Sequence, residues 1–364
     1  MKILFTAQGL RRIGGLQGVV RDLAFGLQKR GHTVLAYCDM EPPPEDSLAD
    51  DSVPITSCMT PLPFVPDVIH AQHHLDAMTA IMALPGVPAV YNCGGATRME
   101  KQPRHPRIVR YVAMSPTSRL RMATESGIDE SLIDVVYNAV DLHRFRVIRN
   151  PPDRPRRALV YRRNLDSDSL IGRQIREAAV VAGLELEFRG IGPKLTPLPN
   201  PQEVLPDYDL VFTSGKSAID ALACGCAVIL LGNTSSGEMV CEANFDRLRR
   251  ANFSVPVNSP PPGAATILGQ IERYSPAQVV ASSRLLRQVA GLDAYVDQFL
   301  AIYGRAIEAR RQADPDLRAE QRAAARYLRS LAPLIRPLDE LPADFEVLRE
   351  TISRQLDATS LAES

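Results

Sequence analysis

The sequence predicts an α/β protein with two domains, each built on a parallel sheet covered by helices. Short apolar segments alternate with stretches of helical period along most of the chain, which is typical of strand–helix units. The 364 residues are enough for two domains of ordinary size. A proline-rich segment at residues 149–157 interrupts the pattern, which restarts after it. We therefore expect domains over residues 1–150 and 151–311, followed by a helical charged tail over 312–364.

The first domain opens with a strand at residues 3–7 and a helix at 18–30, whose apolar face carries Val19, Leu23 and Leu27. Further strands are expected at residues 33–37, 68–71, 89–92, 108–113 and 133–136, and helices at 74–84 and 116–126. In the second domain we expect strands at 158–161, 184–189, 210–213 and 227–231, and helices at 168–182, 217–224, 276–290 and 294–311.

Composition and charge exclude several classes of protein. Lys and Arg together number 42, as do Asp and Glu, so no net field attracts nucleic acid, and none is expected as a partner. The six cysteines have no paired metal-ligand spacing, so no metal site is expected. The first apolar run is too short for a signal peptide, and no uncharged run reaches spanning length. We expect a cytoplasmic protein.

The last sixty residues differ in charge from the rest of the chain. Residues 305–336 contain eight arginines, whereas residues 337–364 contain seven acids and two arginines. This pattern predicts a solvated charged helix that covers the core, and peripheral membrane contact through the arginine face is the alternative. The sequence leaves the oligomeric state open.

A glycine-rich segment, residues 8–18, follows the first strand and holds four glycines. Such a loop lets the backbone approach a ligand closely, and the next helix offers free N–H groups to an anion. The Gly-x-Gly-x-x-Gly pattern of a dinucleotide site is absent, which argues against an NAD enzyme.

The first domain resembles glycosyltransferase family 4. The segments that carry the resemblance are Gly14-Gly15, Leu23-Ala24, Leu27, residues 30–34, 67–73, Ser115 and 136–145. Residues 238–248 and 292–303 also resemble the distal part of bacterial GT-B proteins. The resemblance implies a GT-B fold, in which two Rossmann-like domains face each other across a cleft. It places Gly14 and Gly15 against the donor phosphate or the acceptor, unless the loop only forms a tight turn.

Two residues are candidates for the reacting centre. His73 is expected on the acceptor side, and a surface or core histidine is the alternative. Cys93 stands where the family usually has a histidine near the reacting sugar, so the sequence departs from the family there.

The second domain contains Gly215-Lys216-Ser217 in a tight loop before a helix. Leu210 stands where a Walker phosphate loop needs glycine, so the ATPase interpretation fails. The segment instead resembles the donor-binding segment of GT-B enzymes. This resemblance implies that Gly215, Lys216 and Ser217 hold the diphosphate and that Asp220, at the usual Glu, accepts from ribose hydroxyls. The alternative is that this segment is a capped helix of the protein core that binds no ligand.

Two further positions depart from the family pattern. Phe212 stands where the first of two family glutamates is expected. Arg163 falls where relatives carry a Gly-Arg pair, and it is a candidate clamp for the diphosphate, although the lysine that usually follows is absent.

The resemblance implies a transferase that moves a sugar from a nucleotide diphosphate sugar to a glycan or lipid-linked acceptor in cell-surface polysaccharide or glycan synthesis. It implies retained anomeric configuration, and no cofactor is expected. Arg, Lys and helix dipoles would neutralise the leaving diphosphate in place of a metal. A sugar-nucleotide epimerase of the same fold and a non-catalytic homologue are the alternatives.

Overall fold

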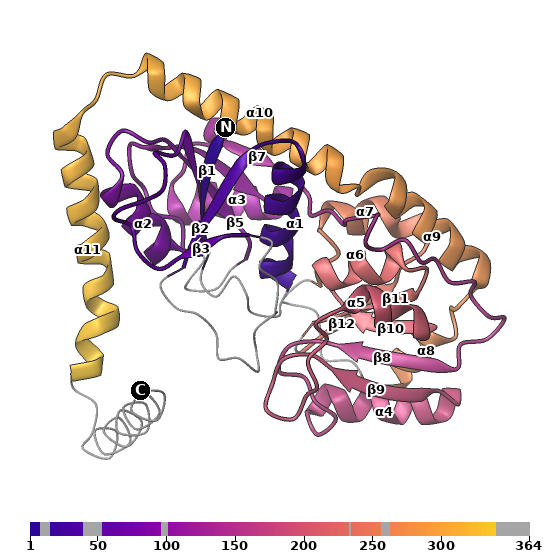
Figure 1. Ribbon diagram of the computed structural model, residues 1–364. Coiled ribbons are helices and arrows are strands. Elements are labelled where there is room, and N and C mark those ends of the chain that lie inside the picture. Colours follow the sequence, from indigo (N-terminus) through magenta and orange to yellow (C-terminus); the bar gives the residue numbers. More distant parts are fainter. Residues whose placement is uncertain (8–14, 39–52, 96–100, 233, 256–262, 340–364) are drawn as a thin grey trace, which may run out of the picture. The chain divides into compact units, whose positions relative to one another are not determined.

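The computed structural model describes residues 1–7, 15–38, 53–95, 101–232, 234–255 and 263–339. These residues form two sheets flanked by helices, which confirms the α/β class (Figure 1). The chain divides into two compact units. The first unit comprises Met1–Gln102 and Arg107–Asp314 and contains both sheets, and the second comprises Pro103–Pro106 and the chain from Pro315 on. The domain boundaries expected from the sequence stay a prediction.

The first sheet is entirely parallel, with strand order β3-β2-β1-β4-β5-β6-β7. Its strands are β1 (Lys2–Thr6), β2 (Thr33–Tyr37), β3 (Ile55–Thr56), β4 (Val68–Ala71), β5 (Ala89–Cys93), β6 (Ile108–Ala113) and β7 (Ile133–Val135). The central strands β4 and β5 are buried along their whole length, as expected for a parallel sheet covered on both faces. The short edge strand β3 was not expected from the sequence.

Helices α1 (Gly15–Lys29), α2 (His74–Ala83) and α3 (Pro116–Ser126) follow strands of the first sheet. Local signals set the ends of α3. Ser115 caps its first turn by accepting a hydrogen bond from the Ser118 backbone N–H, and Pro116 supplies the fixed φ that suits a first helical position. Gly127 ends the helix in the left-handed conformation, with φ of 60°.

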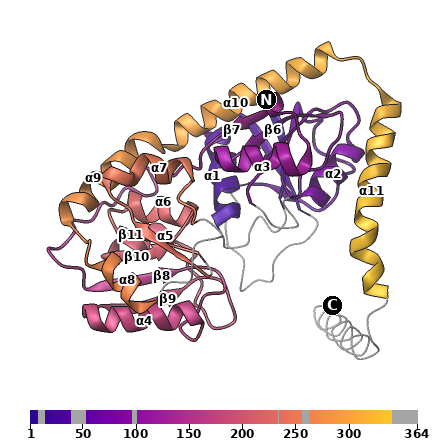
Figure 2. The same ribbon diagram turned by 180° about the vertical axis from the view of Figure 1, so that it is seen from behind.

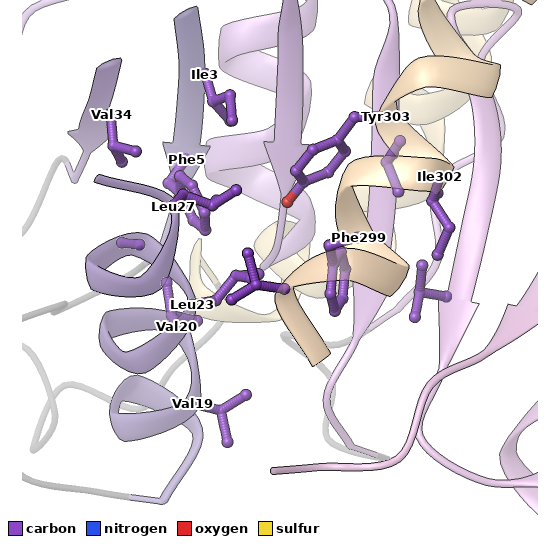
Figure 3. Packing of buried hydrophobic residues seen from close by; sticks show 14 of the residues in the cluster. Ile3, Phe5, Val19, Val20, Leu23, Leu27, Val34, Phe299, Ile302 and Tyr303 are labelled. Carbon is purple, nitrogen blue, oxygen red and sulfur yellow. The ribbon is translucent and has the colours of Figure 1, made fainter. Parts of the chain in front are cut away.

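The core of the first sheet is completed by α10 (Leu292–Gln312), a helix that follows the second sheet in the chain. Phe299, Ile302 and Tyr303 of α10 point toward the same interior as Phe5 of β1 and the apolar face of α1 (Figure 3). The two helices α1 and α10 are in contact, and both views of the ribbon show α10 crossing near one end of α1 (Figures 1 and 2). The approach is close, because a Cβ on Gly26 of α1 would lie 2.6 Å from Val296 Cγ2.

The second sheet has the order β12-β11-β10-β8-β9, and β12 pairs antiparallel with β11. Its strands are β8 (Arg157–Tyr161), β9 (Glu185–Arg189), β10 (Leu210–Thr213), β11 (Ala227–Leu231) and β12 (Ser236–Met239). Its helices are α4 (Leu170–Ala182), α5 (Pro201–Val204), α6 (Lys216–Ala223), α7 (Phe245–Arg250), α8 (Ala264–Ile271) and α9 (Pro276–Val289).

The second unit contains α11 (Leu317–Asp339), the helix expected in the charged tail. Within the described ranges, no helix combines the length and the apolar character needed to span a bilayer.

Candidate functional site

A cavity of about 220 Å³ lies where α1 and α6 begin. Its walls combine residues that follow β5, β6 and β7 of the first sheet with residues that follow β10 of the second. The residues that line it are Gly15, Val19, Asn92, Cys93, Gly94, Met114, Val136, Asn138, Ser214, Gly215, Lys216, Ser217, Asn252 and Ser254. Open α/β sheets bind ligands outside the carboxyl ends of their strands, so this cavity, called the cleft cavity below, is the candidate site.

The structure brings five of the predicted site residues together in the cleft cavity: Gly15, Cys93, Gly215, Lys216 and Ser217. Three others do not line it: His73, Arg163 and Asp220. Gly14 lies outside the described residues. Their functional roles stay predictions.

The turn before α6 has a backbone that favours glycine. Gly215 has φ of 61° and ψ of −133°, a region that other residues rarely adopt. Its N–H donates to the Phe253 carbonyl at 2.9 Å, which ties this turn to the loop after α7. Lys216 and Ser217 in the first turn of α6 line the cavity, so the positive end of the helix dipole lies beside it.

Lys216 is only 7% exposed and lies in a buried charge cluster. Its ammonium donates to the Asp220 carboxylate one turn further along α6, and Nζ lies 3.5 Å from Oδ2 of Asp22 on α1. Asp22 also pairs with Arg144 at 2.9 Å. Burial raises the pKa of Asp220 above its ordinary value, and the Lys216 charge opposes this rise without cancelling it. The cluster joins α1 to α6 beside the cavity.

Two of the three predicted residues that do not line the cavity, His73 and Arg163, have different surroundings. His73 precedes α2 with φ of 51° and is buried, and burial together with the nearby His74 lowers its pKa to about 4. It is therefore neutral near pH 7. Arg163 is exposed in the turn after β8.

Cys93 ends β5 and is held in a polar network. Gln102 Nε2 donates to its Sγ at 2.9 Å, and the thiol donates to the Gly95 carbonyl at 3.3 Å. Arg121 Nη2 lies 3.8 Å from the same sulfur. Cys93 is 1% exposed, so it forms part of the cavity wall with its sulfur already engaged.

Three residues near the site were missed from the sequence. Arg162, directly after β8, donates to Oγ of Ser214, which lines the cavity. Burial lowers the pKa of Arg162. The Arg162-Arg163 pair was a usable signal, because neighbouring side chains at a strand end point to opposite sides. The role of Asp22 could not be predicted from the sequence, because its partners Lys216 and Arg144 lie far away in the chain.

Asn252 is the third missed residue. It has φ of 53° and is 1% exposed, and its Nδ2 donates to Met114 Sδ at 3.4 Å. Asn252 lines the cleft cavity, and its Oδ1 has no hydrogen-bond partner among the residues that the structure describes. Burial of an amide oxygen without a hydrogen-bond donor destabilises the protein. A ligand that donates to this oxygen removes the destabilisation. No sequence pattern indicated this residue.

The fold and the position of the cavity define a GT-B protein, and comparisons with known proteins agree. Residues 13–144 match the family model Glycosyltransferase Family 4. A comparison with curated proteins gives no match. Residues 13–144 therefore resemble family 4, and this match supports a glycosyltransferase role.

Several solved glycosyltransferases have similar folds. One from Rickettsia africae ESF-5 has a TM-score of 0.57 and 14% identity, covering 84% of this chain and 98% of that chain. AviGT4, a glycosyltransferase involved in avilamycin A biosynthesis, has a TM-score of 0.54 and 15% identity, with 85% and 98% covered. WaaG, a glycosyltransferase involved in lipopolysaccharide biosynthesis, has a TM-score of 0.50 and 11% identity, with 85% and 100% covered. These identities are low, so the likeness shows the fold alone.

Proposed function

We propose that the chain transfers a sugar from a nucleotide diphosphate sugar, bound in the cleft cavity, to a glycan or lipid-linked acceptor. The observation that carries this proposal is the convergence of two helix starts on one cavity, with Gly15 from α1 and the turn at Gly215 from α6. N–H groups at helix starts favour anions, and the strand ends of both sheets are the usual ligand position in this architecture.

Neutralising the leaving diphosphate is the main electrostatic task of such a reaction. Lys216 lines the cavity, and Arg162 is bonded to Ser214 in its wall. We propose that these two cations and the α6 dipole perform this task without a metal ion. Among the residues that the structure describes, no three His, Cys, Asp or Glu side chains are placed to hold a metal. Metal independence and retention of configuration both stay proposals.

The charge cluster determines how Lys216 takes part. Its ammonium lies between Asp220 and Asp22, so a donor phosphate competes with these carboxylates for the same cation. Asp220 belongs to the same helix and keeps Lys216 oriented, whereas Asp22 comes from α1. We propose that the donor phosphate replaces Asp22, not Asp220, as the second partner of Lys216.

A non-catalytic homologue is the second candidate function, and two observations favour it. Phe212, at the place of the first family glutamate, is fully buried in the core of the second sheet and supplies no acid to the cavity. Cys93, at the place of the family histidine, is already bonded through its sulfur. Such a protein would bind the nucleotide sugar without turning it over.

A thermal-shift screen with UDP-, GDP- and ADP-sugars tests the binding step. Ligand at 100 times its dissociation constant adds about 2.7 kcal/mol of stability, which is readily detected. Repeating the titration in EDTA tests metal independence, because binding that is lost in EDTA and restored by manganese contradicts it. No stabilisation by any nucleotide sugar would overturn the proposal.

Turnover of the bound nucleotide sugar separates the remaining functions. A transferase releases nucleoside diphosphate faster when a suitable acceptor extract is added. An epimerase exchanges hydrogen at sugar C2 with solvent and needs no acceptor. A non-catalytic homologue shows binding alone. Three further points stay predictions: a role in cell-surface polysaccharide or glycan synthesis, a cytoplasmic location and peripheral membrane contact.

A further inference from the structure

A second cavity, of about 530 Å³, lies apart from the cleft cavity. One wall is the chain from Leu142 to Pro151, which joins the first sheet to the second, and the other wall is α9. We call it the crossover cavity. Its volume lies in the range of small-molecule sites.

Two rows of side chains on α9 form the helical wall, because residues four apart lie on one face of a helix. The inner row is Val279, Ser283 and Arg287, and the outer row is Val280, Arg284 and Gln288. Each row therefore carries an apolar residue and an arginine.

The residues that line the crossover cavity carry positive charges that carboxylates only partly neutralise. Of the described residues that line it, three are arginines and none is acidic. Arg149 pairs with Asp209. Arg287 donates to the neutral carbonyls of Phe145 and Ala223, at 2.8 and 2.9 Å. Neither Arg287 nor Arg284 has an ion pair within the described part of the chain, so two positive charges stay available to an anion.

Two buried polar atoms in the walls of the crossover cavity also have no hydrogen-bond partner among the described residues. Ser283 is 2% exposed, and its hydroxyl is one of these atoms. Nη1 of Arg149, buried in the opposite wall, has none either. Buried donors are rarely left unpaired in folded proteins, so these two donors are consistent with a site for an acceptor group. Leu142, Ile148 and Val279 supply apolar surface beside them.

We propose that the crossover cavity binds an amphipathic anion, namely a carboxylate, sulfonate or phosphate attached to an apolar group. The acidic group lies between the arginines and Ser283, and the apolar group packs against the aliphatic residues. The site is distinct from donor binding, because no residue lines both cavities. It lies where the chain passes between the sheets, since Val140 also pairs with Gly291 just after α9.

The test uses the full chain and two fluorescent probes with the same rings, the anion 8-anilinonaphthalene-1-sulfonate and the neutral N-phenyl-1-naphthylamine. We expect the sulfonate to bind at least tenfold more tightly. Arg284→Gln should weaken the sulfonate about three- to tenfold, more at low salt, and leave the neutral probe unchanged. Arg250→Gln, an exposed arginine outside the cavity, is the matched control and should change neither.

Hydrogen exchange of the wild-type chain locates the probe independently of any variant. Bound sulfonate should slow exchange in residues 147–151 and 279–288. Displacement by decanoate or by 1-naphthoate distinguishes a lipid-like from an aromatic natural ligand. The proposal fails if the neutral probe binds as tightly as the anion, if Arg284→Gln behaves like Arg250→Gln, if protection maps elsewhere, or if neither competitor displaces the probe.

Discussion

The two sheets face the same cavity but differ in how closely they follow a known family. The family 4 match covers residues 13–144, which include every strand of the first sheet except β1. The second sheet has the same general architecture, and its loops carry the cations Arg162 and Lys216. The comparison teaches that family likeness in the first half predicts the fold. It does not predict which charges hold the donor.

The two sheets also differ in how their cores are closed. The second core is covered by helices close in sequence, such as α4, α6 and α9. The first core needs α10, which begins at Leu292, more than a hundred residues after its last strand. The first sheet therefore depends on a segment that the chain reaches only after the second sheet is complete.

The largest expected effect is on the stability of the second sheet. Gly190, directly after β9, has φ of 152°, and a Cβ there would lie 1.8 Å from the Arg162 carbonyl oxygen. Gly190→Ala combines backbone strain with a steric clash and should lower the free energy of unfolding by roughly 3–4 kcal/mol. It should also displace Arg162 and weaken nucleotide binding. Chemical denaturation and calorimetry measure the two effects.

Gly183→Ala is the matched control for this variant. Gly183 is left-handed, with φ of 68°, but a Cβ there would meet nothing within 4 Å. Gly183→Ala should lower the free energy of unfolding by about 1 kcal/mol and leave nucleotide binding unchanged. Equal costs for the two variants would show that the chain relaxes around Arg162.

The next effect concerns donor affinity. Lys216→Ala should raise the dissociation constant for the nucleotide sugar about tenfold or more, because a charged hydrogen bond to phosphate contributes roughly 1.5–3 kcal/mol. The variant should also lose stability, because the buried carboxylates of Asp220 and Asp22 both lose their cation Lys216. Lys194→Ala, an exposed lysine of the same unit paired with Asp168, should change neither. If Lys216→Ala leaves the affinity for the nucleotide sugar unchanged, Lys216 does not contribute to donor binding.

The first sheet should respond to pH through a buried histidine. His70 on β4 is fully buried, stacks on Phe5 with ring centroids 4.4 Å apart, and has its Nδ1 2.7 Å from the Tyr303 hydroxyl. Burial lowers its pKa to about 3. The unfolded chain takes up this proton near pH 6.5 and the folded chain does not, so stability falls as pH falls. From pH 7 to 5 this histidine should cost roughly 2 kcal/mol.

His70→Phe tests this interpretation. Phenylalanine keeps the stacking surface and removes the proton, so the variant should lose about 2 kcal/mol less than the wild type between pH 7 and 5. Urea denaturation at both pH values measures the difference. The same slope in both proteins would assign the acid sensitivity to other groups, of which His73 is one, because its pKa is lowered to about 4.

Local sequence signals account for most of the fold. The apolar strands, the Ser115 cap and the glycine helix ends are set by neighbouring residues, and the structure confirms the α/β class they predict. The packing of α10 on the first sheet depends on contacts between distant segments, which periodicity does not encode. The same holds for the site: Gly215 and Lys216 were identified from one loop, whereas Asp22 approaches Lys216 only after folding.

The smallest expected effect is also the most discriminating, and it concerns Asp220. If Asp220 accepts from ribose hydroxyls, Asp220→Asn should weaken a nucleotide several-fold and leave pyrophosphate unaffected, since pyrophosphate has no ribose. The geometry supports another role, because Asp220 bonds Lys216 and does not line the cleft cavity. We therefore expect the two dissociation constants to change by the same factor, within about twofold, when both are measured by calorimetry. Asp134→Asn, which affects a carboxylate paired with Arg110 and Arg305, is the control for loss of a partly buried charge. A nucleotide-specific loss would restore the ribose role and extend the family pattern into the second sheet, whereas a parallel change would make Asp220 a positioning residue for Lys216.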